Sequence, residues 1–191
     1  YWVARAEVDQ ALTKVDKSGN VLWQWERGWL LGWRRNATAI NERTTISSIL
    51  PRVGFGDSVF LLMPDVALST SLASCLAACL ASMVFDYVAR QKVGGVNYSF
   101  YYMGQLPFIR PARFEAADLA YIVPRVVELV YTAHDVVGFA EDVLAEVGPV
   151  QWAAWFPSRP LMNGKPQPFR WDPERRALLR AELDAYYARL Y

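Results

Sequence analysis

The sequence is poor in the residues that bind metals or form disulfides. Among its 191 residues there are two cysteines and one histidine. Cys75 and Cys79 lie four residues apart in an alanine-rich run, so they cannot build a disulfide framework, and His134 alone cannot supply a site of several histidines. This composition argues against a secreted disulfide scaffold and against a metal centre, and it favours the reducing cytoplasm.

The common catalytic motifs are also missing. The sequence contains no GxxxxGK[ST] phosphate loop, no HExxH zinc motif and no GxSxG nucleophile elbow. His134 lies beside Asp135, but adjacent residues of a helix point about 100° apart, and no nucleophile accompanies the pair. We therefore assign no catalytic residue.

The chain as a whole has almost no excess of positive over negative charge, but positive charge is concentrated in one stretch. The formal net charge is +1, whereas residues 27–52 hold five arginines and one glutamate, a local sum of +4. A basic stretch of this kind is typical of a surface that meets nucleic-acid phosphates. The ordinary alternative is a solvated strand-and-loop edge in which Glu42 and Arg43 form an ion pair, and composition does not decide between the two.

Two segments combine cations with residues that recognise bases. The first is GWRRNATAINERT (residues 32–44), and the second is ARQKVGGVNYSF (residues 89–100), where cations at a predicted helix end precede two glycines. Arginine and threonine suit phosphates, while arginine also suits guanine and asparagine suits adenine. The candidate DNA-binding residues are Arg34, Arg35, Asn41, Arg43, Thr44, Arg90, Gln91, Lys92, Asn97 and Tyr98.

The longest uncharged run covers residues 67–85 and is just long enough to cross a bilayer. It carries several serines and alanines, and its leucines recur at helical spacing. We interpret it as a buried helix packed closely through small residues, and we expect no membrane association.

The remaining patterns predict an α+β fold. We expect a small, mostly antiparallel sheet from residues 21–63 and 97–109, a buried helix at 68–91, and helices at 114–146 and 173–190. A proline-rich loop is expected from Gly148 to Pro173. Residues 1–112 would form a mixed α/β recognition module, and residues 113–191 a helical segment packed on it as one unit.

Four separated blocks, in order, resemble one family. They are NERTTISSILP (residues 41–51), FDYVARQKVGGVNYSFYYMGQLP (residues 85–107), ELVYTAHDVVGFAEDV (residues 128–143) and the C-terminal FRWDPERRALLRAELDAYYARLY. Together they resemble the C-terminal region of large adenine-specific DNA methyltransferases, such as type IIG restriction-modification enzymes and helicase-methylase fusions of phage defence. The chain departs from these relatives at RRNATAI before the first block and at VNYS within the second.

The resemblance implies a target recognition module that binds double-stranded DNA beside an upstream methyltransferase domain of the same chain. S-adenosylmethionine would bind that upstream domain, because the chain has neither an [DNS]PP[YFW] tetrapeptide nor an FxGxG turn. We therefore expect the chain to be a non-catalytic piece of a longer protein. The alternative function is a structural or protein-interaction module that holds methyltransferase, helicase or nuclease domains together.

Overall fold

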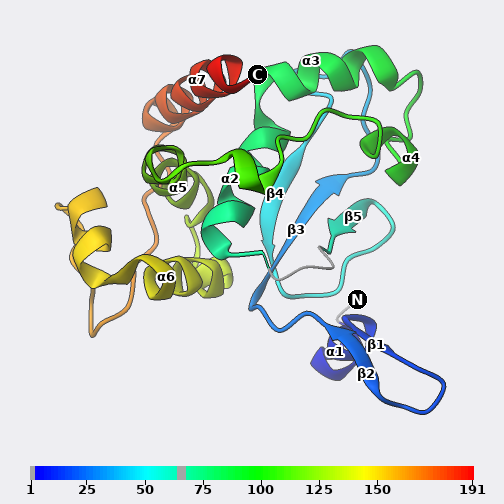
Figure 1. The fold of residues 1–191 in the computed structure, drawn as a ribbon, viewed down its shortest axis with the longest axis horizontal. Coiled ribbons are helices and arrows are strands. Elements are labelled where there is room, and N and C mark those ends of the chain that lie inside the picture. Colours follow the sequence, from blue (N-terminus) through cyan, green and yellow to red (C-terminus); the bar gives the residue numbers. More distant parts are fainter. Residues whose placement is uncertain (1–2, 64–67) are drawn as a thin grey trace.

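The computed structural model describes residues 3–63 and 68–191, and its fold has the predicted α+β class (Figure 1). The helices are α1 (Arg5–Ala11), α2 (Thr70–Ala81), α3 (Met83–Lys92), α4 (Phe100–Met103), α5 (Ala116–Val130), α6 (Val137–Trp155) and α7 (Pro173–Leu190). Short 3-10 turns lie at Pro111–Arg113 and His134–Val136. The strands are β1 (Thr13–Val15), β2 (Val21–Gln24), β3 (Trp29–Arg34), β4 (Ser47–Pro51) and β5 (Val59–Leu62).

The main sheet is antiparallel and has the strand order β4-β3-β5. The central strand β3 is buried along almost its whole length, since Trp29, Leu31 and Trp33 are each at most 2% exposed. At Gly32 a Cβ atom would lie 2.6 Å from the carbonyl oxygen of Phe60 on β5. A glycine is therefore required here for the two strands to approach each other.

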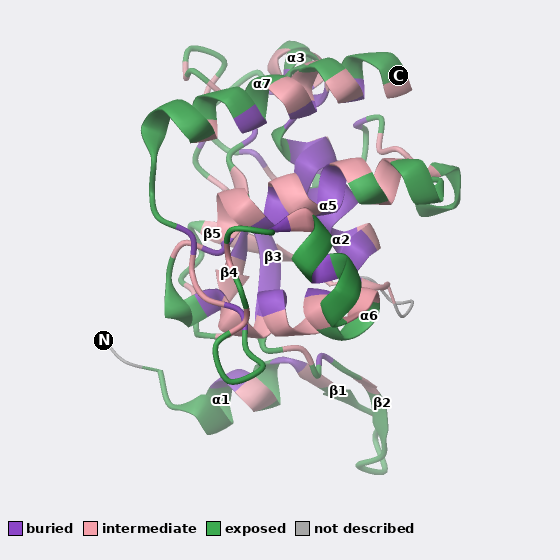
Figure 2. Cartoon of the chain, turned by 90° about the vertical axis from the view of Figure 1, so that its left-hand side faces the viewer, coloured by how far each residue is buried: buried purple, intermediate pink, exposed green. Residues whose placement is uncertain are grey.

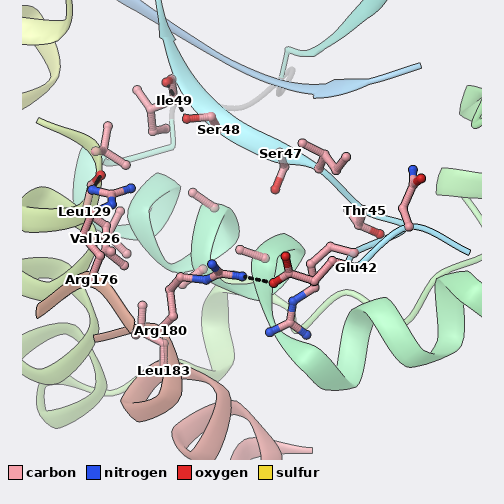
Figure 3. A pocket seen from close by; sticks show the side chains of 17 residues that line it. Glu42, Thr45, Ser47, Ser48, Ile49, Val126, Leu129, Arg176, Arg180 and Leu183 are labelled. Atoms are coloured by element: carbon pink, nitrogen blue, oxygen red, sulfur yellow. Dashed lines mark hydrogen bonds and ion pairs between the residues drawn. The ribbon is translucent and has the colours of Figure 1, made fainter. Parts of the chain in front are cut away.

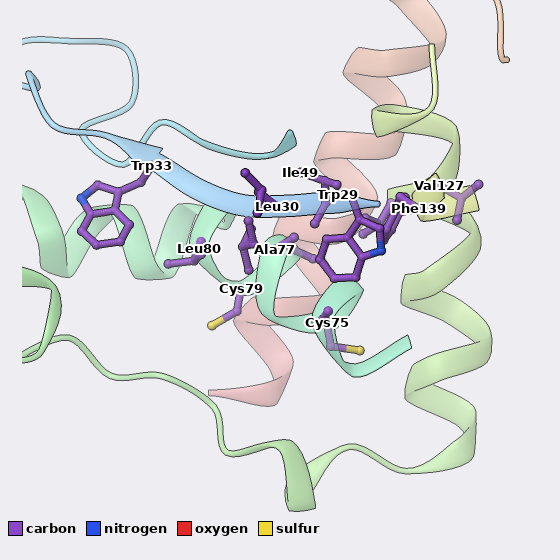
Figure 4. Packing of buried hydrophobic residues seen from close by; sticks show 14 of the residues in the cluster. Trp29, Leu30, Trp33, Ile49, Cys75, Ala77, Cys79, Leu80, Val127 and Phe139 are labelled. Carbon is purple, nitrogen blue, oxygen red and sulfur yellow. The ribbon is translucent and has the colours of Figure 1, made fainter. Parts of the chain in front are cut away.

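Helix α2 lies in the middle of the core (Figure 4). Its side chains Cys75, Cys79 and Leu80 are at most 1% exposed, and the helix packs against α5, α6 and β4. The predicted burial of this uncharged run is thus confirmed for its described part, whereas the first residue of the run, Ala67, lies outside the described residues. Both cysteines serve as small core residues, and burial raises the pKa of each thiol, that of Cys75 to about 12.

The predicted single helix at 68–91 is broken at Ser82, where α2 and α3 meet at an angle of 55°. The Ser82 hydroxyl donates to the Cys79 carbonyl at 2.7 Å and accepts from the amide of Phe85, so it ends one helix and begins the next. No single described helix is both long and apolar enough to cross a membrane, although the bent pair α2 and α3 together has the necessary length and composition.

The expected strand at 97–109 is wrong. Asn97 forms one isolated antiparallel bridge with Asn36, and the chain then turns into α4. Beyond this bridge no described strand pairs with the segment, which contacts the sheet through side chains instead. The ring of Phe100 lies 4.7 Å from that of Phe60 and 4.8 Å from that of Trp33.

The helical boundaries after residue 113 also differ from the prediction. The expected helix at 114–146 is interrupted between α5 and α6, and α6 continues to Trp155, into the region predicted as loop. Gly148 has a φ of 78° and bends α6 there. Pro149 follows the bend, where a proline starts a new helical turn without losing a hydrogen bond. Pro124 lies in the interior of α5.

One hydrophobic cluster joins the two expected segments. It includes Trp29 and Leu80 from residues 1–112 and Val127, Phe139 and Tyr187 from residues 113–191. Figure 2 shows the buried residues gathered on β3, α2 and the inner sides of α5 and α6, with the outer sides of α3 and α7 exposed.

Candidate nucleic-acid interface

Two loops that carry predicted DNA-binding residues lie side by side (Figure 1). We call residues 35–46 the β3–β4 loop and residues 93–99 the α3–α4 loop. The amide of Ala37 donates to the Val96 carbonyl at 3.1 Å, and the amide of Tyr98 donates to the Arg35 carbonyl at 2.7 Å. The two basic segments of the sequence thus form one continuous surface at the end of the sheet.

Arg90, from the last turn of α3, braces the β3–β4 loop. Its guanidinium donates to the backbone carbonyls of Ala39 at 2.7 Å, Asn41 at 2.9 Å and Glu42 at 2.9 Å. It also forms an ion pair with Asp86, one turn earlier on the same helix, at 3.2 Å. Because these contacts occupy most of its donors, Arg90 shapes the loop, and we no longer assign it to DNA.

Two of the predicted contact residues are inside the fold. Tyr98 and Thr44 are both 0% exposed. The Tyr98 hydroxyl lies 3.1 Å from the Thr45 hydroxyl, and burial raises the pKa of Tyr98 to about 12. The Thr44 hydroxyl donates to the Thr38 carbonyl at 3.3 Å. Neither side chain can reach a base or a phosphate in this structure, so both assignments are corrected.

Most arginines of the basic stretch have structural partners. Arg43 pairs with Asp184 of α7 at 2.7 Å, and not with Glu42 as in the alternative interpretation. Arg52 donates to the carbonyls of Trp25 and Arg27. The guanidinium of Arg27 in turn bonds to Thr70 and to the Leu68 carbonyl. The local sum of +4 therefore overstates the charge that is free to meet a ligand.

A smaller set of polar residues remains available on the two loops and at the ends of β3 and α3, which lead into them. We define the loop surface as Arg34, Arg35, Gln91, Lys92 and Asn97. All are exposed except Arg35, which is intermediate. Within residues 3–63 and 68–191, Arg34 and Lys92 form no ion pair.

Arg35 orients a neighbouring amide. Its Nε donates to Oδ1 of Asn97 at 3.1 Å, and its guanidinium forms an ion pair with Asp57. The bond through Oδ1 leaves Nδ2 of Asn97 to donate elsewhere. Asn41 keeps a partly exposed side chain, with Oδ1 lying 3.3 Å from the Thr38 hydroxyl.

The sequence patterns did not identify the apolar residues around this surface. Ile40 is 93% exposed at the tip of the β3–β4 loop, Val96 is 67% exposed, and Tyr101 on α4 is 75% exposed. Tyr101 was assigned to a strand, which hid its exposure. Ile40 has a local signal, because no helical or strand period places it in the core.

In the described part of the chain, no group of three or more His, Cys, Asp or Glu side chains is arranged to hold a metal ion. Comparison with protein-family models, with curated proteins and with solved structures found no match. The DNA-methyltransferase resemblance is therefore carried by the quoted sequence blocks alone.

Proposed function

We propose that the chain binds duplex DNA through the loop surface, as the target recognition part of an adenine-N6 DNA methyltransferase or restriction-modification protein. The observation that carries the proposal is the meeting of the two loops. Backbone hydrogen bonds join them, and Nε of Arg35 donates to Oδ1 of Asn97 between them. Arg34 and Lys92 are exposed at the ends of β3 and α3, next to the two loops. The methyl donor and the flipped adenine belong, in this proposal, to the methyltransferase domain.

The exposed side chains divide into two roles. Arg34 and Lys92 have free charges and meet phosphates, which fixes the register of the protein on the duplex. Gln91 and Asn97 carry amides that reach base edges. Because Arg35 holds Oδ1 of Asn97, the Nδ2 hydrogens suit acceptors such as guanine O6 and N7 or thymine O4.

The structure lowers the number of expected phosphate contacts. Arg43 is engaged by Asp184 in a largely buried pair. This leaves Arg34, Lys92 and Arg35, whose ion pair with the exposed Asp57 is weak. Three phosphate contacts give a slope of roughly −2.7 in a plot of log binding constant against log salt, since each contributes about −0.9.

The test is a salt series on a mixed-sequence duplex with the Arg34→Ala/Lys92→Ala variant. We expect the slope to fall to roughly −0.9 because this variant no longer neutralises two of the three phosphates. The matched control is Arg5→Ala/Lys17→Ala, which removes the same charge from exposed positions on α1 and the β1–β2 turn. Equal slopes in the wild type and both variants would contradict the proposal and favour the structural or protein-interaction module.

A second measurement separates base contacts from phosphate contacts. Asn97→Ala and Gln91→Ala should reduce the preference among duplex sequences, by about 1–3 kcal/mol for each side chain that binds a base edge with two hydrogen bonds. They should leave the salt slope unchanged. Selection from a random duplex library supplies the preferred site, and competition with scrambled DNA measures the preference.

A further inference from the structure

A groove outside the loop surface runs along the free edge of β4. It encloses about 400 Å³ and is bounded by β4, the end of the β3–β4 loop, α2, α5 and α7. Figure 3 shows β4 on one side, Arg176 and Arg180 of α7 on the other, and α2 behind them. The groove is large enough for a bound ligand.

The free edge of β4 directs backbone groups towards this groove. β4 is the outer strand of the sheet, and no described strand pairs with its free side. The amide of Arg34 donates to the Ile46 carbonyl. Alternation along an antiparallel ladder then directs the amides and carbonyls of Ser47 and Ile49 away from β3, into the groove. The Ile49 carbonyl accepts from the Ser48 hydroxyl at 2.9 Å, and its second lone pair can accept from an added strand. Such an edge is a template for a further strand.

The base of the groove is apolar and leaves space for side chains. It is formed by the alanines Ala77, Ala78 and Ala81 of α2, with Val126 of α5 beside them. Oγ of Ser47 is buried and has no hydrogen-bond partner among the described residues. An occupant with polar backbone groups and small apolar side chains fits this combination.

The rim is cationic. Arg176 and Arg180 line the groove with one acidic residue, Glu42, whereas Arg43, which also lines it, is paired with Asp184. The Arg180–Glu42 pair, at 3.3 Å, is largely exposed, so it is weak. Arg176 donates to the Leu129 carbonyl at 2.7 Å and forms no ion pair within the described residues. Burial, and then the nearby Arg180, lower the pKa of Arg176, as expected for a cation without a carboxylate partner.

We infer that this groove binds an acidic, extended peptide segment of a partner protein by strand addition to β4. The peptide backbone pairs with Ser47 and Ile49, alternate side chains lie on the alanines of α2, and a carboxylate meets Arg176 and Arg180. Ser47–Ile49 gives hydrogen bonds to about three peptide residues, which corresponds to a short strand.

The test uses three labelled peptides and fluorescence anisotropy. The acidic probe is acetyl-VEVDVE-amide, the charge control is acetyl-VKVKVK-amide, and the backbone control is the acidic peptide with N-methyl groups on alternate residues. We expect the acidic peptide to bind the chain. The lysine peptide should not bind because it repels the arginines, and the N-methyl peptide should not bind because it cannot pair with β4.

Two variants of the chain locate the site. Arg176→Gln/Arg180→Gln should weaken binding by about tenfold for each charge-assisted hydrogen bond that it removes. Its matched control, Arg5→Gln/Arg170→Gln, removes the same charge from exposed positions and should bind normally. Ser47→Pro removes an outward amide and keeps the ladder to β3, since proline is tolerated on the free side of an edge strand, and it should also weaken binding.

Circular dichroism and thermal unfolding establish that each variant is folded. If Ser47→Pro unfolds, the N-methyl peptide and the arginine variant still test whether the peptide adds to β4.

Absence of binding by the acidic peptide, or binding that neither variant changes, would overturn the inference. So would a concentration-dependent dimer that Ser47→Pro makes monomeric, because a second copy would then occupy β4. Arg34→Ala/Lys92→Ala leaves this groove intact, so DNA binding and peptide binding are separable.

Discussion

At the residue scale, several arginines of this protein bond to backbone carbonyls. Arg52 bonds to the carbonyls of Trp25 and Arg27, Arg176 to that of Leu129, and Arg90 to three carbonyls of the β3–β4 loop. A guanidinium offers five donors in a fixed plane, so it can satisfy several acceptors of an irregular segment at once. These arginines therefore hold loops in place where no strand or helix does.

Replacing Arg90 tests this role. Arg90→Ala removes the donors to Ala39, Asn41 and Glu42, and we expect the free energy of unfolding to fall by about 1–3 kcal/mol in urea denaturation. Lys92→Ala is the matched control, because Lys92 is exposed two residues away, and its effect should stay within about 0.5 kcal/mol. Equal free energies of unfolding for the two variants would mean that the hydrogen bonds of Arg90 do not stabilise the fold.

We expect the free energy of unfolding to fall in alkali as Tyr98 ionises. Burial raises its pKa to about 12 in the folded protein, whereas a tyrosine in an unfolded chain titrates near pH 10. Its contribution is complete below about pH 10 and is lost as the pH rises towards about 12, because the unfolded state releases the proton first. Urea unfolding at about pH 8 and about pH 11 should show a smaller drop for Tyr98→Phe than for the wild type.

Other buried tyrosines, including Tyr131 and Tyr187, also have a raised pKa. Tyr98→Phe should therefore keep part of the alkaline decline. An identical decline in both proteins would show that Tyr98 ionises as easily in the fold as in water.

At the element scale, the N-terminus of α2 depends on a carboxylate from α6. Glu146 accepts hydrogen bonds from the amides of Thr70 and Ser71 and from the Ser71 hydroxyl. Burial raises the pKa of Glu146, but these hydrogen bonds outweigh burial and the net pKa is lowered. A negative charge at a helix N-terminus is also favoured by the helix dipole.

Glu146→Gln should lower the free energy of unfolding by about 1–2 kcal/mol near neutral pH. The folded pKa is below the ordinary 4.5, so the benefit is present above that value and is lost as the pH falls through the folded pKa. The two proteins should therefore converge in acid. Glu26→Gln, at an exposed position, should behave as the wild type at each pH, and a difference that persists in acid would exclude the charge as its cause.

Local signals in the sequence predicted some elements well and others poorly. Helix α7 was predicted at residues 173–190 because Asp172 caps it and Pro173 starts it, and Oδ1 of Asp172 indeed accepts from the amide of Arg175 at 3.0 Å. The segment 97–109 was misassigned because strand propensity depends on how the side chains pack, and here Phe100 packs on Trp33 and Phe60 from helix α4.

In the candidate site, too, some properties follow from the local sequence and others depend on partners far away in the chain. Exposure of Arg34, Gln91 and Lys92 follows from polar residues at the ends of elements, whereas the fate of Arg43 depends on Asp184, which is 141 residues away. A run of charges in the sequence does not reveal such a partner. The burial of Tyr98 likewise depends on Thr45 and Trp33, which only the folded chain brings to it.

At the scale of the whole molecule, residues 1–112 and 113–191 share one core, so we expect them to unfold together. Tryptophan fluorescence and far-UV circular dichroism should give the same urea midpoint. A fragment of residues 1–112 should lack a cooperative transition, because without α5 it exposes the side of α2 that packs on Val123 and Val127. A dispersed amide NMR spectrum from that fragment would contradict this prediction.

The hydrogen bonds from Arg90 to the β3–β4 loop do not depend on the side chains of that loop. In this loop Arg90 donates to the main-chain oxygens of Ala39, Asn41 and Glu42 and to no side chain. Every amino acid supplies such an oxygen. The side chains at these positions can therefore diversify while the loop keeps its shape. Substitution of residues 39–42 should then leave the hydrogen bonds between the two loops intact, so that Arg35 and Asn97 keep their positions.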